Sequence, residues 1–336
     1  MDKPVYIVGA GLAVSDAALQ LAARGIDVRL FEMRPLKQTD VHKTGLCAEL
    51  VCSNSLKSTK AASAAGMLKR ELEVLHSFVY ACALESAVPA GGALAVDREI
   101  FAQKVTELID GSEHIELVRE EVCSLREVAT DACAVILATG PLTSDALAAS
   151  LGEITGGESL AFFDAAAPIV MADSLDMDKL FRQSRYEDAG GNVGDYLNAP
   201  MDRDEYEQFI DELLAARKVI MHDFESHDLF QACQPIEEIA RAGRDAPRYG
   251  PLKPVGLTDP RTGRRPWAAV QLRAENAEKT CYNLVGFQTN LAFDEQKRVF
   301  SMIPGLEHAE FARLGVMHRN TFIDAPRLLD SSLRLV

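Results

Sequence analysis

The chain has 336 residues, of which 48% are hydrophobic, and a formal net charge of −15. These values are typical of a globular protein with a sizeable core, and they argue against disorder and against non-specific binding to nucleic acid. No apolar run approaches the length of a membrane span, and the N-terminus lacks the layout of a signal peptide, so we expect a cytoplasmic protein with no membrane partner.

The first 32 residues follow the pattern of a β-α-β nucleotide-binding unit. VYIVGAG predicts a buried strand, LAVSDAALQLAARG a helix that ends near Gly25, and IDVRLFE a second strand that ends at Glu32. Glu32 lies 23 residues after Gly9, near the position where an acid binds a ribose hydroxyl in dinucleotide-binding folds. We therefore expect an α/β, Rossmann-like domain.

The turn between the first strand and the helix departs from G-x-G-x-x-G at one position. It reads Gly9, Ala10, Gly11, Leu12, Ala13, Val14. Gly9 would make the tight turn, and Gly11 would let a pyrophosphate approach the helix N-terminus. The third glycine normally packs the helix against the strand, and Val14 overpacks that seam at a cost of about 1–3 kcal/mol. We expect a nucleotide fold with a displaced helix.

The following segments alternate between helix and strand patterns. We expect a loop over 35–60, one helix over 61–84, a glycine turn and a helix within 88–109, and strands at 114–118 and 120–125. The apolar strand 133–141 ends in Thr139 and Gly140. This ending is common where a flavoprotein chain returns to its nucleotide domain, but an ordinary strand and turn would look the same.

A change of character begins near residue 151. Residues 162–171 look like a strand, 202–218 like an acidic helix, and 241–265 form a loop with seven basic and two acidic residues. That loop is either a solvated surface or a phosphate-contacting surface that would use Arg244, Arg248, Arg264 and Arg265. We expect residues 1–150 to form the first part of the nucleotide domain, 151–275 an inserted α+β domain, and 276–336 a return to the nucleotide domain.

Two of the seven cysteines lie in settings that suggest reactivity. Cys52 stands among small polar residues with Lys57 nearby, and Cys233 precedes a predicted helix start; a cation or a helix N-terminus favours a thiolate. Either cysteine could instead be structural. The cysteines are scattered without a C-x-x-C pair, so we expect neither a zinc site nor a disulfide framework.

Segments spread along the whole chain resemble the folate- and FAD-dependent tRNA (uracil-5-)-methyltransferase family. They include AELVCSNSLKS, VPAGGALAVDRE, ATGPLTS, FFDAAAPIV, DYLNAPM, GPLKPVGL, VGFQTNL, EQKRVFSMIPGLE and MHRNTFI. The resemblance implies a glutathione-reductase-like FAD-binding fold with an inserted domain. The wobble-uridine-modifying flavoprotein, a relative, fits these segments less well.

The resemblance also implies a reaction. Flavin, reduced by NADH or NADPH, carries a methylene group from 5,10-methylenetetrahydrofolate to carbon 5 of a uridine in the tRNA T-loop. A cysteine thiolate adds to carbon 6 of the uracil and so activates carbon 5. The two functional cysteines of the family match Cys52 and Cys233, with their division of roles left open. The family glycine motif matches residues 9–14, apart from Val14.

The chain also stops before a second glycine-rich, flavin-contacting segment that the family carries. We therefore expect weak FAD binding by this chain alone, with a complementing polypeptide or an oligomer as a way to complete the fold. Two other functions remain open at this point: a non-catalytic remnant that binds tRNA or protein, and a flavin oxidoreductase with no RNA substrate. The two matched cysteines argue against the oxidoreductase.

Overall fold

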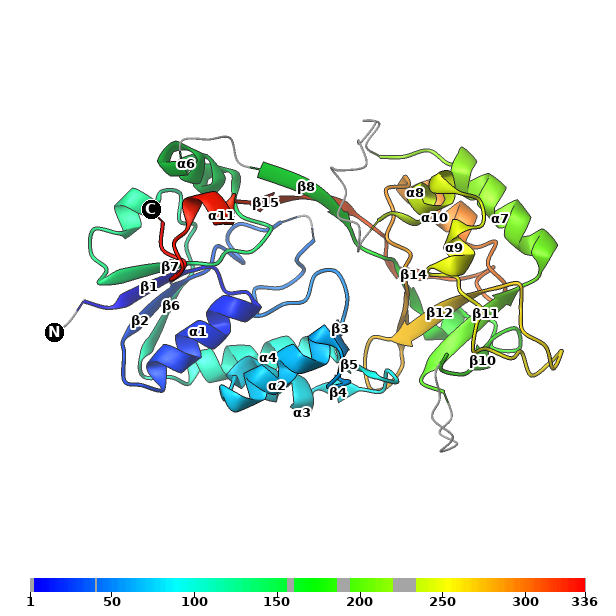
Figure 1. Cartoon of the computed structure of the whole chain (residues 1–336), viewed down its shortest axis with the longest axis horizontal. Helices are drawn as coiled ribbons and strands as arrows, with labels where there is room; N and C mark the ends of the chain where they lie inside the picture. Colours follow the sequence, from blue (N-terminus) through cyan, green and yellow to red (C-terminus); the bar gives the residue numbers. More distant parts are fainter. Residues whose placement is uncertain (1–2, 40, 156–159, 186–193, 220–233, 336) are drawn as a thin grey trace.

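The computed structural model describes residues 3–39, 41–155, 160–185, 194–219 and 234–335, and the chain folds into two units joined by a two-stranded link (Figure 1). The first unit is built on a parallel sheet and the second on an antiparallel sheet. The link pairs β8 (Leu160–Ala165) with β15 (Met317–Phe322) in antiparallel fashion.

The first unit contains a four-stranded parallel sheet in the order β6-β2-β1-β7. Its strands are β1 (Val5–Val8), β2 (Val28–Phe31), β6 (Ile115–Val118) and β7 (Ala134–Leu137). In the sheet, β1 lies between β2, the next strand in the sequence, and β7, which comes much later. The strand order therefore reverses at β1, and a topological switch point lies at its carboxyl end. Ligands of open α/β sheets bind at such points. The Rossmann-like fold expected from the sequence is confirmed.

Helices and a small second sheet complete this unit. The helices are α1 (Leu12–Ala22), α2 (Ala64–Val74), α3 (Phe78–Glu85), α4 (Arg98–Asp110), α5 (Leu125–Val128), α6 (Asp145–Thr155) and α11 (Ala325–Leu328). The small sheet has the order β3-β5-β4, with β3 (Ser55–Ser58), β4 (Ala87–Val88) and β5 (Ala93–Val96). α1 and α4 pack on one face of the parallel sheet, in one cluster of buried side chains with Ile7 and Leu30.

Three local expectations for this unit were wrong. The loop expected over 35–60 ends in strand β3, which pairs with β5. The helix expected over 61–84 is two helices, because the Ser77 hydroxyl accepts a hydrogen bond from Tyr80 N and begins a new helix, after His76 has adopted a φ of 53°. The strand expected at 120–125 is irregular: Glu120 N donates to Glu32 O beyond the end of β2, and Ser124 then precedes α5.

The second unit is a six-stranded sheet in the order β10-β11-β12-β13-β9-β14. The strands are β9 (Ile169–Met171), β10 (Phe181–Arg182), β11 (Tyr196–Met201), β12 (Ala268–Ala274), β13 (Cys281–Leu284) and β14 (Phe311–Arg313). The helices are α7 (Arg203–Ala215), α8 (Ile236–Ala242), α9 (Ala246–Tyr249) and α10 (Phe293–Phe300), with a 3-10 turn at Ala172–Ser174.

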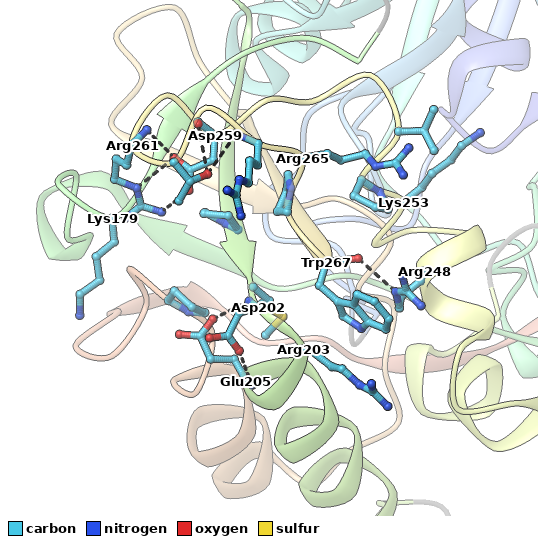
Figure 2. A pocket seen from close by; sticks show the side chains of 18 of the residues that line it. Lys179, Asp202, Arg203, Glu205, Arg248, Lys253, Asp259, Arg261, Arg265 and Trp267 are labelled. Carbon is cyan, nitrogen blue, oxygen red and sulfur yellow. Dashed lines mark hydrogen bonds and ion pairs between the residues drawn. The ribbon is translucent and has the colours of Figure 1, made fainter.

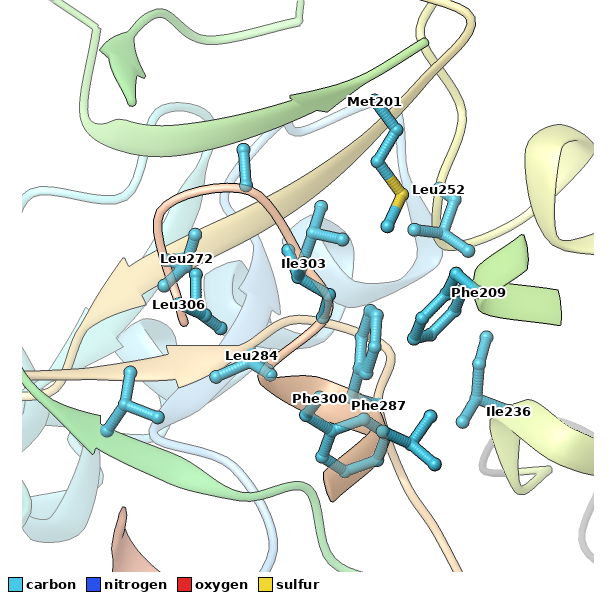
Figure 3. Close-up of a cluster of buried hydrophobic side chains, with 14 of the residues drawn as sticks. Met201, Phe209, Ile236, Leu252, Leu272, Leu284, Phe287, Phe300, Ile303 and Leu306 are labelled. Carbon is cyan, nitrogen blue, oxygen red and sulfur yellow. The ribbon is translucent and has the colours of Figure 1, made fainter. Parts of the chain in front are cut away.

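The core of the second unit lies between this sheet and its helices. Figure 3 shows Phe209, Phe287 and Phe300 meeting in this core, where the Phe287 and Phe300 rings are 5.4 Å apart at 79°, an edge-to-face contact. β12 runs through the middle of the sheet, and all seven of its residues are buried.

The boundary expected at residue 275 needs correction. β13 pairs with both β12 and β9, and β14 pairs with β9, so the chain stays in the second sheet up to Arg313. The reason is a hairpin: Glu275 N donates to Cys281 O, which returns the chain directly beside β12. The chain leaves the second unit only with β15.

Candidate active site and basic groove

The glycine turn after β1 forms one wall of a crevice at the switch point of the parallel sheet. Gly9 has a φ of 101°, and a Cβ on it would lie 3.0 Å from Thr139 Cα, so only glycine fits there. A Cβ on Gly11 would meet no described atom within 4 Å. The space in front of Gly11 is therefore open to a ligand, whereas the space beside Gly9 is filled by the chain.

The remaining residues of the fingerprint divide between the surface and the core. Ala10 and Val14 are buried, whereas Leu12 and Ala13, in the exposed first turn of α1, lie where helix N–H groups lack intrahelical acceptors. Val14 has no exposed surface and packs in the cluster of Ile7 and Leu30, between helix and sheet. The altered position thus belongs to the packing seam and not to the ligand-facing side.

Glu32 fixes the turn from the end of β2. Its carboxylate accepts hydrogen bonds from Ala10 N at 2.9 Å and from Arg34 N and Nε at 2.9 and 2.8 Å. Burial acts to raise the pKa of Glu32, but the hydrogen bonds and the charge of Arg34 outweigh it and hold the pKa below its ordinary value. Glu32 is therefore an ionised acceptor in the crevice, and Arg34 is a partner that the sequence did not reveal.

Thr139 lines the crevice beside Gly9, and Gly140 follows it in the turn after β7. Gly140 has a φ of 70°, and a Cβ on it would meet no described atom within 4 Å. Thr139 Oγ1 lies 2.6 Å from Thr143 Oγ1, which orders the turn that follows β7. Gly9, Ala10, Gly11, Glu32 and Thr139 line one cavity, so residues distant in sequence meet where the sequence pattern predicted a nucleotide.

Cys52 lies where the two units meet. Its side chain is half-buried, and its Sγ is 3.8 Å from Ala165 O at the end of β8. The Cys52 carbonyl accepts from Arg98 Nη2 at 3.3 Å. Arg98 and Arg313 both line a cleft of about 540 Å³ beside this loop. Lys57, which the sequence suggested as the neighbouring cation, is exposed in β3, and these two arginines take that place.

A second site, the basic groove, occupies about 1060 Å³ beside β11, α7 and α9 in the second unit (Figure 2). Its charged lining consists of Lys179, Asp202, Arg203, Glu205, Arg248, Lys253, Asp259, Arg261, Arg264 and Arg265. Arg248 stacks on Trp267 with 3.6 Å between its guanidinium carbon and the ring centroid, and its Nε donates to Trp267 O at 3.0 Å.

The four arginines expected to contact RNA differ in their positions. Arg248, Arg264 and Arg265 line the basic groove. Within the described residues, Arg264 and Arg265 are exposed and have no side-chain ion pair. Arg244 does not line the groove, and its Nη1 donates to Asp211 Oδ1 at 2.6 Å. The groove therefore brings together three of the four arginines.

Cys233 lies outside the described residues, two positions before Pro235, the N-cap of α8. In the part of the chain that the structure describes, no three His, Cys, Asp or Glu side chains come together as a metal site would require. None of the helices described has the length and apolar character of a membrane span.

Comparisons with known proteins agree with this architecture. Residues 4–336 match the family model of glucose inhibited division protein A. Two crystal forms of GidA from Aquifex aeolicus superpose with a TM-score of 0.69 over 99% of this chain. The matched region makes up 58% of the GidA chain in one crystal form and 61% in the other, at 13% and 14% sequence identity, which shows a shared fold.

Sequence relatives are much closer. Methylenetetrahydrofolate–tRNA-(uracil-5-)-methyltransferase TrmFO of Geobacter sulfurreducens is 57% identical over 100% of this chain, and TrmFO of Bacillus licheniformis is 53% identical over 99%. The chain spans 76% and 75% of the length of these relatives. The chain therefore belongs to the glucose inhibited division protein A family and, within it, to the folate- and FAD-dependent tRNA (uracil-5-)-methyltransferases.

Proposed function

We propose that the protein methylates carbon 5 of a T-loop uridine in tRNA, with 5,10-methylenetetrahydrofolate as the carbon donor and FAD as the carrier. We further propose NADH or NADPH as the reductant and the cytoplasm as the location. The observation that carries the proposal is the position of Cys52 between the nucleotide crevice and the second unit, beside Arg98, in a chain 57% identical to a named tRNA (uracil-5-)-methyltransferase.

The residues of the crevice fit the nucleotide half of FAD. The open space at Gly11 and the N-terminus of α1 suit a pyrophosphate, and the ionised Glu32 suits a ribose hydroxyl. Ala10, Leu12 and Ala13 would contribute backbone at the same place, with Thr139 and Gly140 in the turn after β7. FAD, when bound, would carry the methylene group and supply the electrons that complete the methyl group.

Cys52 would act on the uracil itself. Its thiolate, or that of Cys233, would add to carbon 6, which turns the adjoining carbon 5 into a nucleophile. Arg98 and Arg313 bring positive charge to this loop, and a neighbouring cation favours a thiolate. Cys233 would be the second cysteine of the reaction, and one of the two would handle the proton that leaves carbon 5.

The basic groove would hold the tRNA backbone while one base reaches Cys52. β12 begins directly after Trp267, which lines the groove. Arg273 lies near the other end of β12, where its guanidinium donates to Ser53, the residue after Cys52. At a rise of about 3.3 Å per residue, Trp267 and Arg273 are about 20 Å apart along β12. A loop with its stem attached can span that distance, and the target base must leave its stack.

The test is transfer of labelled methylene from folate to a T-arm transcript by the purified chain with FAD and NADPH. We expect label in the RNA, none in a transcript that lacks the target uridine, and none with Cys52→Ala or Cys233→Ala. Cys123→Ala, which alters an exposed cysteine, is the control and should transfer at the normal rate.

The same assay separates the other two functions. Near-normal transfer by both cysteine variants would remove the covalent mechanism. Bound flavin with NADPH oxidation but no labelled RNA would indicate an oxidoreductase. A colourless protein that still binds RNA would indicate a non-catalytic binding protein.

A further inference from the structure

The loop that carries Cys52, residues 50–54, is held on one side by Arg98. Arg98 Nη1 donates to Leu50 O at 2.8 Å, and its Nη2 donates to Cys52 O at 3.3 Å. These two hydrogen bonds attach one guanidinium to the loop on both sides of Val51. A planar guanidinium that binds two carbonyls restricts the rotation of the segment between them.

Arg98 is itself fixed from the second unit. Its Nε donates to Glu275 Oε2 at 2.5 Å and its Nη2 to Glu275 Oε1 at 3.3 Å. Glu275 follows β12 and is buried. Because both carboxylate oxygens are engaged, the guanidinium has a defined orientation as well as a defined position.

A second arginine holds the other end of the loop. Arg273, in β12, donates from Nε to Asn54 Oδ1 at 2.8 Å and from Nη2 to Ser53 Oγ at 2.6 Å. Asn54 is fully buried, and its Nδ2 donates to Val96 O at 3.0 Å and Ala274 O at 3.1 Å. The amide of Asn54 thus joins a strand of each unit.

We propose that Arg98 and Arg273 are positioning residues that place Cys52 relative to the crevice, using the carboxyl end of β12 as their fixed support. Neither residue needs to touch the substrate. Both act through the backbone and side chains of residues 50–54, from the side of the molecule that also forms the basic groove. This assignment rests on the proposed function of Cys52 as a reacting group.

The test compares three variants of the Arg98–Glu275 ion pair with one control. Arg98→Gln removes the cation, Arg98→Lys keeps a charged donor, and Arg98→Glu combined with Glu275→Arg restores the ion pair but cannot donate to Leu50 O and Cys52 O. The control is Asp195→Ala, which removes the 2.6 Å hydrogen bond from Gly91 N, another contact between the units that involves none of residues 50–54. Each protein is assayed for kcat and KM with a T-arm transcript and for amide hydrogen exchange over residues 48–58.

For Arg98→Gln we expect kcat to fall about 10- to 100-fold, because small misplacements of reacting groups have effects of this size. KM for the RNA should change by less than about threefold, since the groove is untouched. Exchange over residues 48–58 should rise about tenfold. Arg98→Lys should recover part of kcat, the charge-swapped pair should not, and Asp195→Ala should match the unmodified protein in both measurements.

Three results would overturn the assignment: unchanged exchange and kcat in Arg98→Gln, a loss carried by KM alone, or full activity in the charge-swapped pair. If the swapped pair fails to fold, the contrast between Arg98→Gln and Arg98→Lys decides. Absence of methyl transfer by the unmodified chain would contradict the proposed function instead, and the exchange rates would still show whether Arg98 holds the loop.

Discussion

The crevice at the end of β1 presents glycine backbone together with Glu32, Arg34 and three further glutamates, whereas the basic groove beside β11 presents mainly guanidinium groups and an indole ring. The first arrangement would recognise the proposed FAD by close approach to the main chain, which depends mainly on shape. The second would attract the proposed RNA through side-chain charge, which salt weakens. The two units should therefore respond to substitution in different ways.

The largest effect should come from the two glycines of the crevice. Gly9→Ala combines a left-handed φ with a Cβ 3.0 Å from Thr139 Cα, so we expect it to destabilise the fold by about 1–3 kcal/mol and to abolish flavin retention. Gly11→Ala should leave the melting temperature unchanged, because its Cβ meets no described atom, and should weaken FAD binding about 10- to 100-fold by filling ligand space. Thermal unfolding measures the stability of each variant, and flavin titration measures its FAD affinity. A Gly11→Ala variant that binds FAD as tightly as the parent would show that the open space at Gly11 is not a ligand site.

In the groove, the effect should depend on which arginines are removed. Replacing Arg264 and Arg265 together with Ala should weaken T-arm RNA binding and lower the slope of log K against log salt by up to about 1.8, at roughly 0.7–0.9 for each of two phosphate contacts. Arg244→Ala, whose side chain is paired with Asp211, should change the slope little. Binding titrations at several salt concentrations give the slopes. An unchanged slope in the double variant, or in the quadruple variant that also lacks Arg244 and Arg248, would remove the groove as the RNA site.

Glu32→Gln should give a smaller effect with a pH signature. An amide cannot accept from both Ala10 N and Arg34, so we expect a loss of about 1–3 kcal/mol at pH 7. Because the folded pKa of Glu32 lies below the unfolded value of 4.5, this contribution is present above pH 4.5 and is lost as the pH falls through the folded pKa. Urea unfolding at pH 7 and at pH 3.5 gives the free energy of unfolding of variant and parent. The difference between the two free energies should be smaller at pH 3.5 than at pH 7.

Glu116→Gln is the matched control for that measurement, since Glu116 is 61% exposed in its pair with Arg29. It should change stability by less than about 0.5 kcal/mol at either pH. A difference for Glu32→Gln that stays constant from pH 7 to pH 3.5 would show that Glu32 is not ionised in the folded protein.

The smallest effect on ligand binding should come from Val14. Val14→Gly restores the family fingerprint, but it removes a fully buried side chain from the seam between α1 and the sheet. We expect FAD affinity to change by less than about threefold and stability to fall by about 2–3 kcal/mol, from the cavity and from glycine in a helix. Flavin titration and thermal unfolding test this. If Val14→Gly binds FAD stoichiometrically and the parent does not, weak FAD binding arises from Val14 in the fingerprint.

The sequence predicted the crevice better than the second unit because its signals are local. Strand, glycine turn, helix and Glu32 all lie within the first 32 residues, whereas the Thr139 ending of its strand alone left an ordinary turn equally open. The second sheet depends on pairings that no short pattern specifies, such as β13 beside β9, which is why the boundary at 275 was misplaced. The contacts of Arg98 with Glu275 and of Arg273 with Asn54 join residues 177 and 219 positions apart, so spacing could not reveal them. The groove was anticipated as a charge cluster, but its lining required the fold, which excluded Arg244 and added Trp267.

The assignment of FAD to the crevice and of RNA to the basic groove is tested most directly by titrating two variants with both ligands. Gly11→Ala and the Arg264→Ala, Arg265→Ala double variant are each titrated with FAD and with T-arm RNA at one salt concentration. We expect Gly11→Ala to lose FAD affinity and keep RNA affinity, and the double variant to do the reverse. If one variant loses both ligands to the same extent while remaining folded, or if each loses the other's ligand, the assignment of FAD to the crevice and RNA to the basic groove is contradicted.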